Sequence, residues 1–204
     1  MASRHLIVFD MGGVLVRIWH SWDAAAKAAG RPGCPVDYQI QLAPIVNRYE
    51  RGKINTRTYV REICRSSDQL YQPDDILAIH RSIIIEIYPG APKLLLQLEQ
   101  RGVRTAVLSN TDEAHWSLME AWHLFETFAY LFPSHQTGVL KPGPKAYSQV
   151  EEASGYSREQ IVYFDDREEN VAAARSRSWQ AFYVDPYGDP IAAVRNILLR
   201  LRIL

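Results

Sequence analysis

The chain has 204 residues, of which 47% are hydrophobic and 23% are charged, a balance typical of a globular protein with one sizeable core. Its 23 basic and 23 acidic residues cancel, and no segment approaches the roughly 20 apolar residues that a membrane span needs. The composition argues against general nucleic-acid binding, which needs a basic excess, and against a membrane partner.

The start of the chain, "MASRHLIVFD", lacks the long apolar stretch of a secretory signal, and its apolar run ends at Asp10. Because nothing indicates secretion, we expect Cys34 and Cys64 to be free thiols rather than a disulfide. A cytoplasmic protein is therefore the expectation. The sequence leaves open whether it is a monomer or a homodimer.

Short apolar runs predict the strands of a buried sheet. Residues 5–9, "HLIVF", form a continuous run that we expect to be buried on both faces. Similar runs occupy residues 103–109, 161–164 and 181–184, and a weaker one residues 128–132. Helical patterns lie between or after them, at residues 91–102, 143–155 and 167–178. This alternation predicts an α/β fold with a Rossmann-like parallel sheet and right-handed crossovers.

Residues 17–88 break this alternation, because they contain no clear buried strand. Their patterns predict helices within residues 21–30, 38–52, 55–66 and 73–88, and Asn55 is a plausible N-cap of the third. We therefore predict two domains: an α/β core of residues 1–16 and 89–204, and an inserted helical cap of residues 17–88. The terminal stretch 189–204 is amphipathic, and we expect it to pack on the sheet.

Polar side chains follow several predicted strands at the point where each strand ends. Ligands of an open parallel sheet bind beyond these carboxyl ends, so the side chains are expected to converge at one edge. Each residue alone could be a turn former, a helix cap or a surface charge. Their joint occurrence favours a functional site. The candidates are Asp10, Ser109, Asn110, Thr111, Lys141, Asp165 and Asp166.

This set of residues suits phosphoryl transfer. Carboxylates at two strand ends can hold Mg²⁺ through hard oxygen ligands, and Asp10 can also serve as a nucleophile. The small residues Gly12 and Gly13 let backbone amides approach phosphate oxygens. Ser109 and Asn110 can donate hydrogen bonds to another oxygen of the phosphate.

Lys141 can balance the carboxylate of Asp10 and the charge of the transition state. A small phosphorylated metabolite is therefore the expected partner, and Mg²⁺ the expected cofactor.

Four motifs carry a family resemblance: "FDMGGVLV", "VLSNT", "LKPGPKAY" and "VYFDDREENVAAA", in this order along the chain. With them the chain resembles the haloacid dehalogenase (HAD) superfamily of hydrolases. The segment "YERGKINTRTYVREI" is similar to the cap of members that carry a helical cap after the first strand. By eye the chain looks most like the bacterial sugar-phosphate phosphatase-like proteins and the phosphatase domain of soluble epoxide hydrolases.

The resemblance implies a role for each matching residue. Asp10 matches the nucleophile, which forms an aspartyl-phosphate and also binds the metal. Gly12 matches a position whose backbone carbonyl binds the metal. Lys141 matches the lysine of the third motif, and Ser109 the hydroxyl that binds phosphate. Asp165 and Asp166 match the metal-binding pair, in which we favour Asp166 as the direct ligand.

One departure from the family pattern concerns Gly12, because this position usually also supplies an aspartate as general acid and base. Without it, the chain is expected to be a slower phosphatase, or one whose acid comes from elsewhere, with His20 as a candidate. The alternative is a non-catalytic relative that binds phosphate or a protein. Dehalogenation, which needs no metal, is disfavoured by the retained acidic pair. Phosphonate cleavage through Lys27 or Lys53 is a further alternative.

Overall fold

The structure is a computed structural model, and it describes residues 4–31, 33, 36–67 and 70–204 of the chain. A five-stranded sheet lies at its centre, with the strand order β5-β4-β1-β6-β7 and only parallel pairings. These strands are β1 (Leu6–Phe9), β4 (Arg104–Ser109), β5 (Tyr130–Pro133), β6 (Ile161–Asp165) and β7 (Gln180–Tyr183). The predicted Rossmann-like α/β fold is thus confirmed, and the weak run near residue 130 is a strand.

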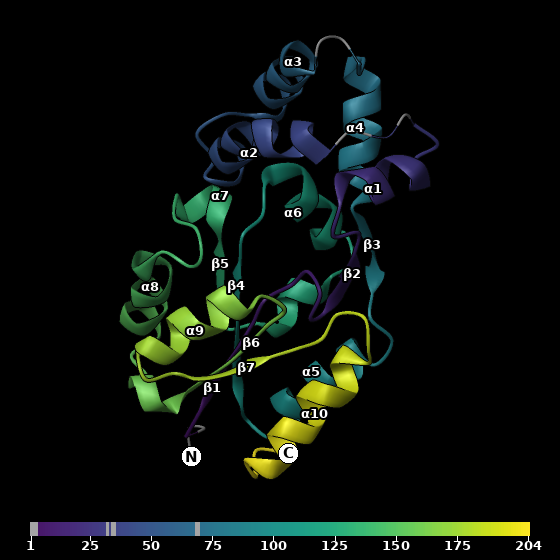
Figure 1. The fold of residues 1–204 in the computed structure, drawn as a ribbon. Coiled ribbons are helices and arrows are strands. Elements are labelled where there is room, and N and C mark those ends of the chain that lie inside the picture. Colours follow the sequence, from purple (N-terminus) through teal and green to yellow (C-terminus); the bar gives the residue numbers. More distant parts are fainter. Residues whose placement is uncertain (1–3, 32, 34–35, 68–69) are drawn as a thin grey trace.

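Helices cover both faces of the sheet (Figure 1). Alternate residues of β1 enter two different cores, which explains why its run of apolar residues is continuous. Ile7 and Phe9 pack with α5 (Ala91–Gln100), α6 (Glu113–Glu120) and α10 (Pro190–Arg200). Leu6 and Val8 pack with α8 (Pro144–Ser154) and α9 (Glu168–Ser176).

The terminal helix α10 packs its apolar face into the first of these cores through Val194 and Leu198, as its amphipathic pattern predicts. Three shorter elements complete the part of the α/β layer that the structure describes. They are the four-residue helix α7 (Ser134–Thr137) and the 3-10 helices η1 (Leu124–Thr127) and η2 (Arg158–Gln160).

Four helices form a separate layer beyond the carboxyl edge of the sheet, at the top of Figure 1. They have their own apolar core, in which Tyr49, Tyr59 and Ile79 are almost fully buried. The predicted N-cap Asn55 is confirmed, since its side chain accepts a hydrogen bond from the backbone of Thr58 at 2.9 Å. The helices are α1 (Trp22–Ala28), α2 (Val36–Glu50), α3 (Thr56–Ser66) and α4 (Pro73–Ser82).

The prediction of one helix over residues 73–88 is wrong at its end. Helix α4 stops at Ser82, and β3 (Ile84–Ile87) pairs antiparallel with β2 (Val16–Ile18) as a two-stranded ribbon. The isoleucines of β3 favour a strand, and the partner strand lies about 70 positions away in the sequence. The ribbon joins the two layers: the chain enters the helical layer through β2 and returns to the α/β layer through β3 (Figure 1). The division into domains at residues 16 and 88 stays a prediction.

Among the described residues, no helix combines the length and the apolar character needed to cross a membrane. Cys64 is a free thiol, whereas Cys34, the other half of the disulfide that the sequence analysis disfavoured, lies outside the described residues.

Candidate active site

The carboxyl ends of three adjacent strands position the polar residues of the site. Asp10 follows β1, Ser109 ends β4 and Asp165 ends β6, and β1 lies between the other two strands. The backbone amide of Asp10 donates to the carbonyl of Phe164 at 2.9 Å, which continues the pairing of β1 with β6 up to the site. The sheet therefore holds these side chains along one short edge.

Lys141 connects two of the carboxylates. Its Nζ lies 3.0 Å from Asp10 Oδ1 and 2.8 Å from Asp165 Oδ2, and all three residues are buried. Burial alone would lower the pKa of Lys141, but the carboxylates of Asp10 and Asp165 outweigh it and raise that pKa. The lysine is therefore a fixed positive charge between them.

Asn110 holds Lys141 in place through the backbone. Its Nδ2 donates to the carbonyl of Lys141 at 2.9 Å, and its Oδ1 accepts from the amide of Lys141 at 2.8 Å. The sequence predicts that Asn110 donates to a phosphate, whereas in the structure its side-chain amide bonds to the backbone of Lys141 and orients this lysine. Ser109 is buried at the end of β4, and Thr111 is bonded through its backbone amide to Ser134 Oγ at 2.9 Å.

Asp165 has its oxygens occupied by protein donors. Besides Lys141, it accepts hydrogen bonds from the Arg167 amide at 2.8 Å, from Asn170 Nδ2 at 3.0 and 3.1 Å, and from the Tyr163 hydroxyl. A carboxylate with this many donors is locked in orientation. Its evident role in the structure is to hold Lys141 and the start of α9.

Asp166 differs from Asp165, because its carboxylate faces the loop after β1. A Cβ atom at Gly13 would lie 2.4 Å from Asp166 Oδ2, and Gly13 has a φ of 75°. Only glycine satisfies both conditions without strain or displacement. The same carboxylate oxygen lies 3.6 Å from Nδ1 of His20, the residue that the sequence analysis named as a substitute acid.

The negative charge of this cluster exceeds its positive charge. Asp10, Asp165 and Asp166 each offer an oxygen, and these oxygens lie within 4.8 Å of one another, with one lysine in contact. Burial together with Asp10 and Asp165 raises the pKa of Asp166 to about 7. Burial also raises the pKa of Asp10, against the effect of Lys141. A divalent cation bound by hard oxygen ligands would offset this excess, so the donor set fits Mg²⁺.

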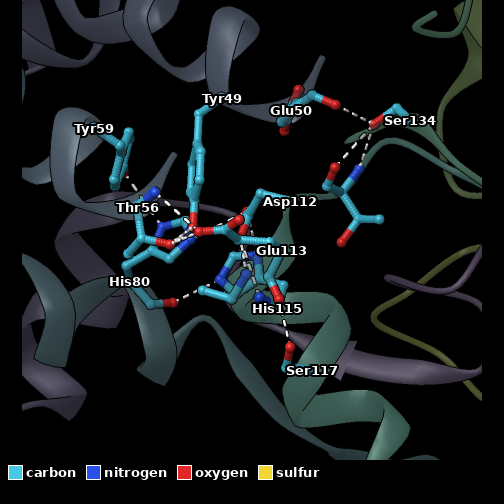
Figure 2. Close-up of polar contacts among 12 residues, drawn as sticks. Tyr49, Glu50, Thr56, Tyr59, His80, Asp112, Glu113, His115, Ser117 and Ser134 are labelled. Carbon is cyan, nitrogen blue, oxygen red and sulfur yellow. Dashed lines mark hydrogen bonds and ion pairs between the residues drawn. The ribbon is translucent and has the colours of Figure 1, made fainter. Parts of the chain in front are cut away.

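A second buried cluster, which the sequence analysis missed, joins the helical layer to the α/β layer. His80 on α4 and His115 on α6 stack at 3.9 Å, and each has a ring nitrogen 3.1 Å from Asp112 Oδ2 (Figure 2). His115 Nε2 also donates to the carbonyl of His80 at 2.7 Å. The only trace in the sequence is the spacing of Asp112 and His115, which is also that of an ordinary helix N-cap.

The two histidines of this second cluster are oriented toward Asp112 rather than toward a shared ion. The ligand atoms of His80, Asp112 and His115 lie within 4.8 Å of one another. However, the two rings are parallel within 8°, so their lone pairs point along two separate planes, which disfavours one ion bound by both rings. Both nitrogens of His115 instead face acceptors, which requires the cationic form. Burial lowers the pKa of His115 but Asp112 overcomes it, and the net effect is a raised pKa. The cluster is a charged, hydrogen-bonded contact between two layers.

A groove of about 710 Å³ on α3 and α4, lined by residues such as Val60, Cys64 and Leu77, contains none of the strand-end residues. The acidic cluster with its lysine, rather than this groove, is therefore the candidate active site.

The parallel sheet with an acidic edge, a bridging lysine and a helical layer above it defines a Rossmann-like hydrolase. Residues 5–176 match the haloacid dehalogenase-like hydrolase family, and the chain belongs to this family. The resemblance seen in the sequence motifs is thereby confirmed.

Relatives of the chain include proteins of two activities. It is 29% identical to phosphatase MT3486 of Mycobacterium tuberculosis over 117 residues, which cover 56% of this chain and 54% of that protein. The alignment thus spans about half the length of that relative. It is also 26% identical to haloacetate dehalogenase H-2 of Moraxella sp., over 92% of this chain and 88% of that protein.

A solved structure with the same fold is that of a HAD family enzyme, bt-2542, from Bacteroides thetaiotaomicron in complex with magnesium and inorganic phosphate. Its TM-score is 0.78 at 22% identity, and the alignment covers 91% of this chain and 96% of that one. At this identity the likeness shows the fold.

Proposed function

We propose that this protein is a Mg²⁺-dependent phosphatase that hydrolyses a small phosphorylated metabolite such as a sugar phosphate. The observation that carries the proposal is the unbalanced cluster of Asp10, Asp165 and Asp166 around Lys141 at the carboxyl edge of the sheet. Asp166 favours this function over metal-free dehalogenation, because Asp165 already holds Lys141 and Asp166 remains as an oxygen ligand for a metal. The fold and a phosphatase among the relatives support the same assignment.

In this proposal, Asp10 is the nucleophile. Its carboxylate oxygen attacks phosphorus and forms an aspartyl-phosphate as the alcohol leaves, and water then attacks this phosphorus and restores the carboxylate. Lys141, 3.0 Å from Asp10, orients the nucleophile and neutralises charge on the transferring phosphoryl group. The Ser109 hydroxyl and the backbone amide of Gly12 would bind the remaining phosphate oxygens, since the amides of residues 13–16 already donate to backbone carbonyls of the same loop.

Asp10, Asp166 and the carbonyl of Gly12 would hold the Mg²⁺, and Asp165 would act mainly by positioning Lys141 because its oxygens already have protein donors. When bound, Mg²⁺ supplies positive charge that favours the ionised form of Asp10 and stabilises the phosphate oxygens. The residues of the chain supply the nucleophile, the fixed cation and the donors.

The test is a panel of phosphate monoesters and haloacids, assayed with and without Mg²⁺ on the wild type, Asp10→Asn and Asp166→Ala. We expect phosphate release that needs Mg²⁺ and is lost in both variants, with folding retained. Mg²⁺ should also raise the melting temperature of the wild type but not of Asp166→Ala. Halide release without metal would establish a dehalogenase instead, and binding of phosphate without turnover of any ester would establish the non-catalytic alternative.

A further inference from the structure

The loop that follows β1 offers no proton donor for a leaving alcohol. In the family pattern the residue two positions after the nucleophile is an aspartate, and here it is Gly12. General acid–base help typically contributes about 10²–10⁴-fold to a rate, so an unactivated ester needs this proton from another group. Such a group would be a carboxyl group or an imidazole near the cluster that makes no other interaction.

Glu50 is such a group. It is the last residue of α2, and among the described residues its carboxylate makes no hydrogen bond or ion pair. Its only dashed contact in Figure 2 joins its backbone carbonyl to Ser134 Oγ, which donates at 2.7 Å. An unpaired carboxylate that is partly withdrawn from water is costly to the fold and calls for a functional explanation.

The backbone around Glu50 is fixed to the edge of the sheet that carries the active site. Ser134 Oγ shares its single proton between the carbonyl of Glu50, at 2.7 Å, and the carbonyl of Thr111, at 2.9 Å, close to the end of β4. Arg51 Nη1 donates to the carbonyl of Gly138 at 3.3 Å. The next residue, Gly52, lies so close to the core that a Cβ atom there would be 2.1 Å from the carbonyl of His135. Residues 50–52 therefore pack against residues 134–138, which precede Lys141 in the chain.

The charges that act on the Glu50 carboxylate come from both clusters. Burial is the largest influence and, with Asp112, raises its pKa; Arg167, His115 and Lys141 oppose this effect. Lys141 is the residue that contacts Asp10, so Glu50 lies within the electrostatic reach of the catalytic centre. Tyr59, from α3, is the other titratable group coupled to it. The net result is a pKa of about 7, which lets a carboxyl group both donate and accept a proton at neutral pH.

We propose that Glu50 is the general acid and base of this enzyme, in place of the carboxylate missing at position 12. This inference rests on the proposed phosphatase function. Its carboxyl proton passes to the bridging ester oxygen as the bond from phosphorus to that oxygen breaks and Asp10 bonds to phosphorus. The resulting carboxylate then takes a proton from the attacking water as the bond between Asp10 and phosphorus breaks, which releases phosphate and restores the starting state.

His20 is a weaker candidate for this role. Its ring lies against Asp166 at 3.6 Å and against Tyr187 at 5.3 Å between ring centroids. It is therefore already in contact with a residue that is needed for the metal, whereas the carboxylate of Glu50 has no such contact.

The test compares Glu50→Gln with wild type on two esters, β-glycerol phosphate, whose alcohol needs a proton to leave, and para-nitrophenyl phosphate, whose phenolate does not. We expect kcat/KM to fall by roughly 100-fold or more for the first and by less than about 10-fold for the second. In the wild type, kcat/KM for the alkyl ester should fall as the pH rises through about 7, and this limb should be absent in Glu50→Gln. Glu50→Asp should recover part of the rate.

The matched control is Glu62→Gln, the same change on α3, where the carboxylate pairs with Arg48 at 2.7 Å, whereas the carboxylate of Glu50 has no such partner among the described residues. This control should leave both esters unaffected. The role of Glu50 would be refuted if Glu50→Gln left kcat/KM for the alkyl ester unchanged. It would also be refuted if both esters lost the same factor and the pH profile stayed the same. Either result would leave the proposed phosphatase function standing. If Glu50→Gln does not fold, the wild type alone decides: a kcat/KM for the alkyl ester that does not fall as the pH rises through about 7 would refute the role of Glu50. A wild type that cleaves no ester of the phosphate monoester panel refutes the phosphatase itself.

Discussion

Restoring a carboxylate at position 12 by Gly12→Asp tests both the site and the assignment of Glu50. Gly12 does not have a left-handed φ, in contrast to Gly13, so an aspartate there causes no backbone strain. Its Cβ would lie 2.9 Å from Cδ1 of Ile18, the far end of a flexible side chain at the end of β2. A carbon–carbon contact needs about 3.5–4.0 Å, so Ile18 has to rotate.

The effect on stability should be small. Displacing the tip of Ile18 costs about 0.5–1.5 kcal/mol, and loss of the freedom of glycine in the unfolded chain returns about 0.4–1 kcal/mol. The net change in the free energy of unfolding should therefore stay within about 1 kcal/mol. The neighbouring carboxylates of Asp10 and Asp166 would raise the pKa of the new group, which suits a proton donor.

The effect on activity depends on the background. In the wild type, Glu50 already supplies the proton, and Gly12→Asp should change the alkyl-ester kcat/KM by less than about 10-fold. In Glu50→Gln, the added change Gly12→Asp should recover a large part of the roughly 10²–10⁴-fold loss, with para-nitrophenyl phosphate little affected. The assay is kcat/KM for both esters in the four proteins, with melting temperatures as a control for folding. A folded double variant without recovery on the alkyl ester would refute the reasoning about position 12.

Three further changes probe the site and its surroundings. Gly13→Ala should displace the Asp166 carboxylate, so thermal melting should show a folded protein whose stabilisation by Mg²⁺ is lost; undiminished stabilisation would contradict the close packing seen here. Lys141→Met leaves the buried carboxylates of Asp10 and Asp165 without their ion-pair partner, so denaturant titration should show a free energy of unfolding lower by about 3–5 kcal/mol. Mg²⁺ should restore part of this loss. A change below about 1 kcal/mol would be inconsistent with the buried pairs. The pKa of His115 is raised in the folded protein above its ordinary value of 6.5, so protonation of His115 stabilises the fold. This stabilisation is complete at a pH below 6.5, and it is lost as the pH rises through the pKa of the folded state. The melting temperature of wild type should therefore fall relative to His115→Gln above about pH 6.5, and parallel curves would contradict a cationic His115.

The sequence by itself determined the α/β core. The strands are short apolar runs, because a parallel sheet covered on both faces buries nearly all side chains of its central strands, and periodic helices separate the runs. The same logic located Asp10, Asp165 and Asp166, since parallel strands bring their carboxyl ends to one edge. Lys141 was indicated instead by its place in the segment before α8. These inferences rest on local pattern and on a rule of chain topology, and both are readable without coordinates.

Other features were decided by contacts between segments that lie far apart in the sequence. The sequence predicts helix where the structure has β3, because its partner β2, which completes its hydrogen bonds, lies at the other end of the helical insertion. Asp165 and Asp166 are adjacent and chemically identical, yet four protein groups bind one and Gly13 packs against the other.

Glu50 is one acidic residue among 23 acidic ones in the sequence. Only the docking of α2 on the Ser134 segment withdraws its carboxylate from water and places it in the field of Lys141. Likewise, His80 and His115 become a charged contact only because α4 and α6 bring them onto one oxygen of Asp112. Burial and the neighbouring charges set the pKa of such groups, and both are properties of the folded chain rather than of the residue.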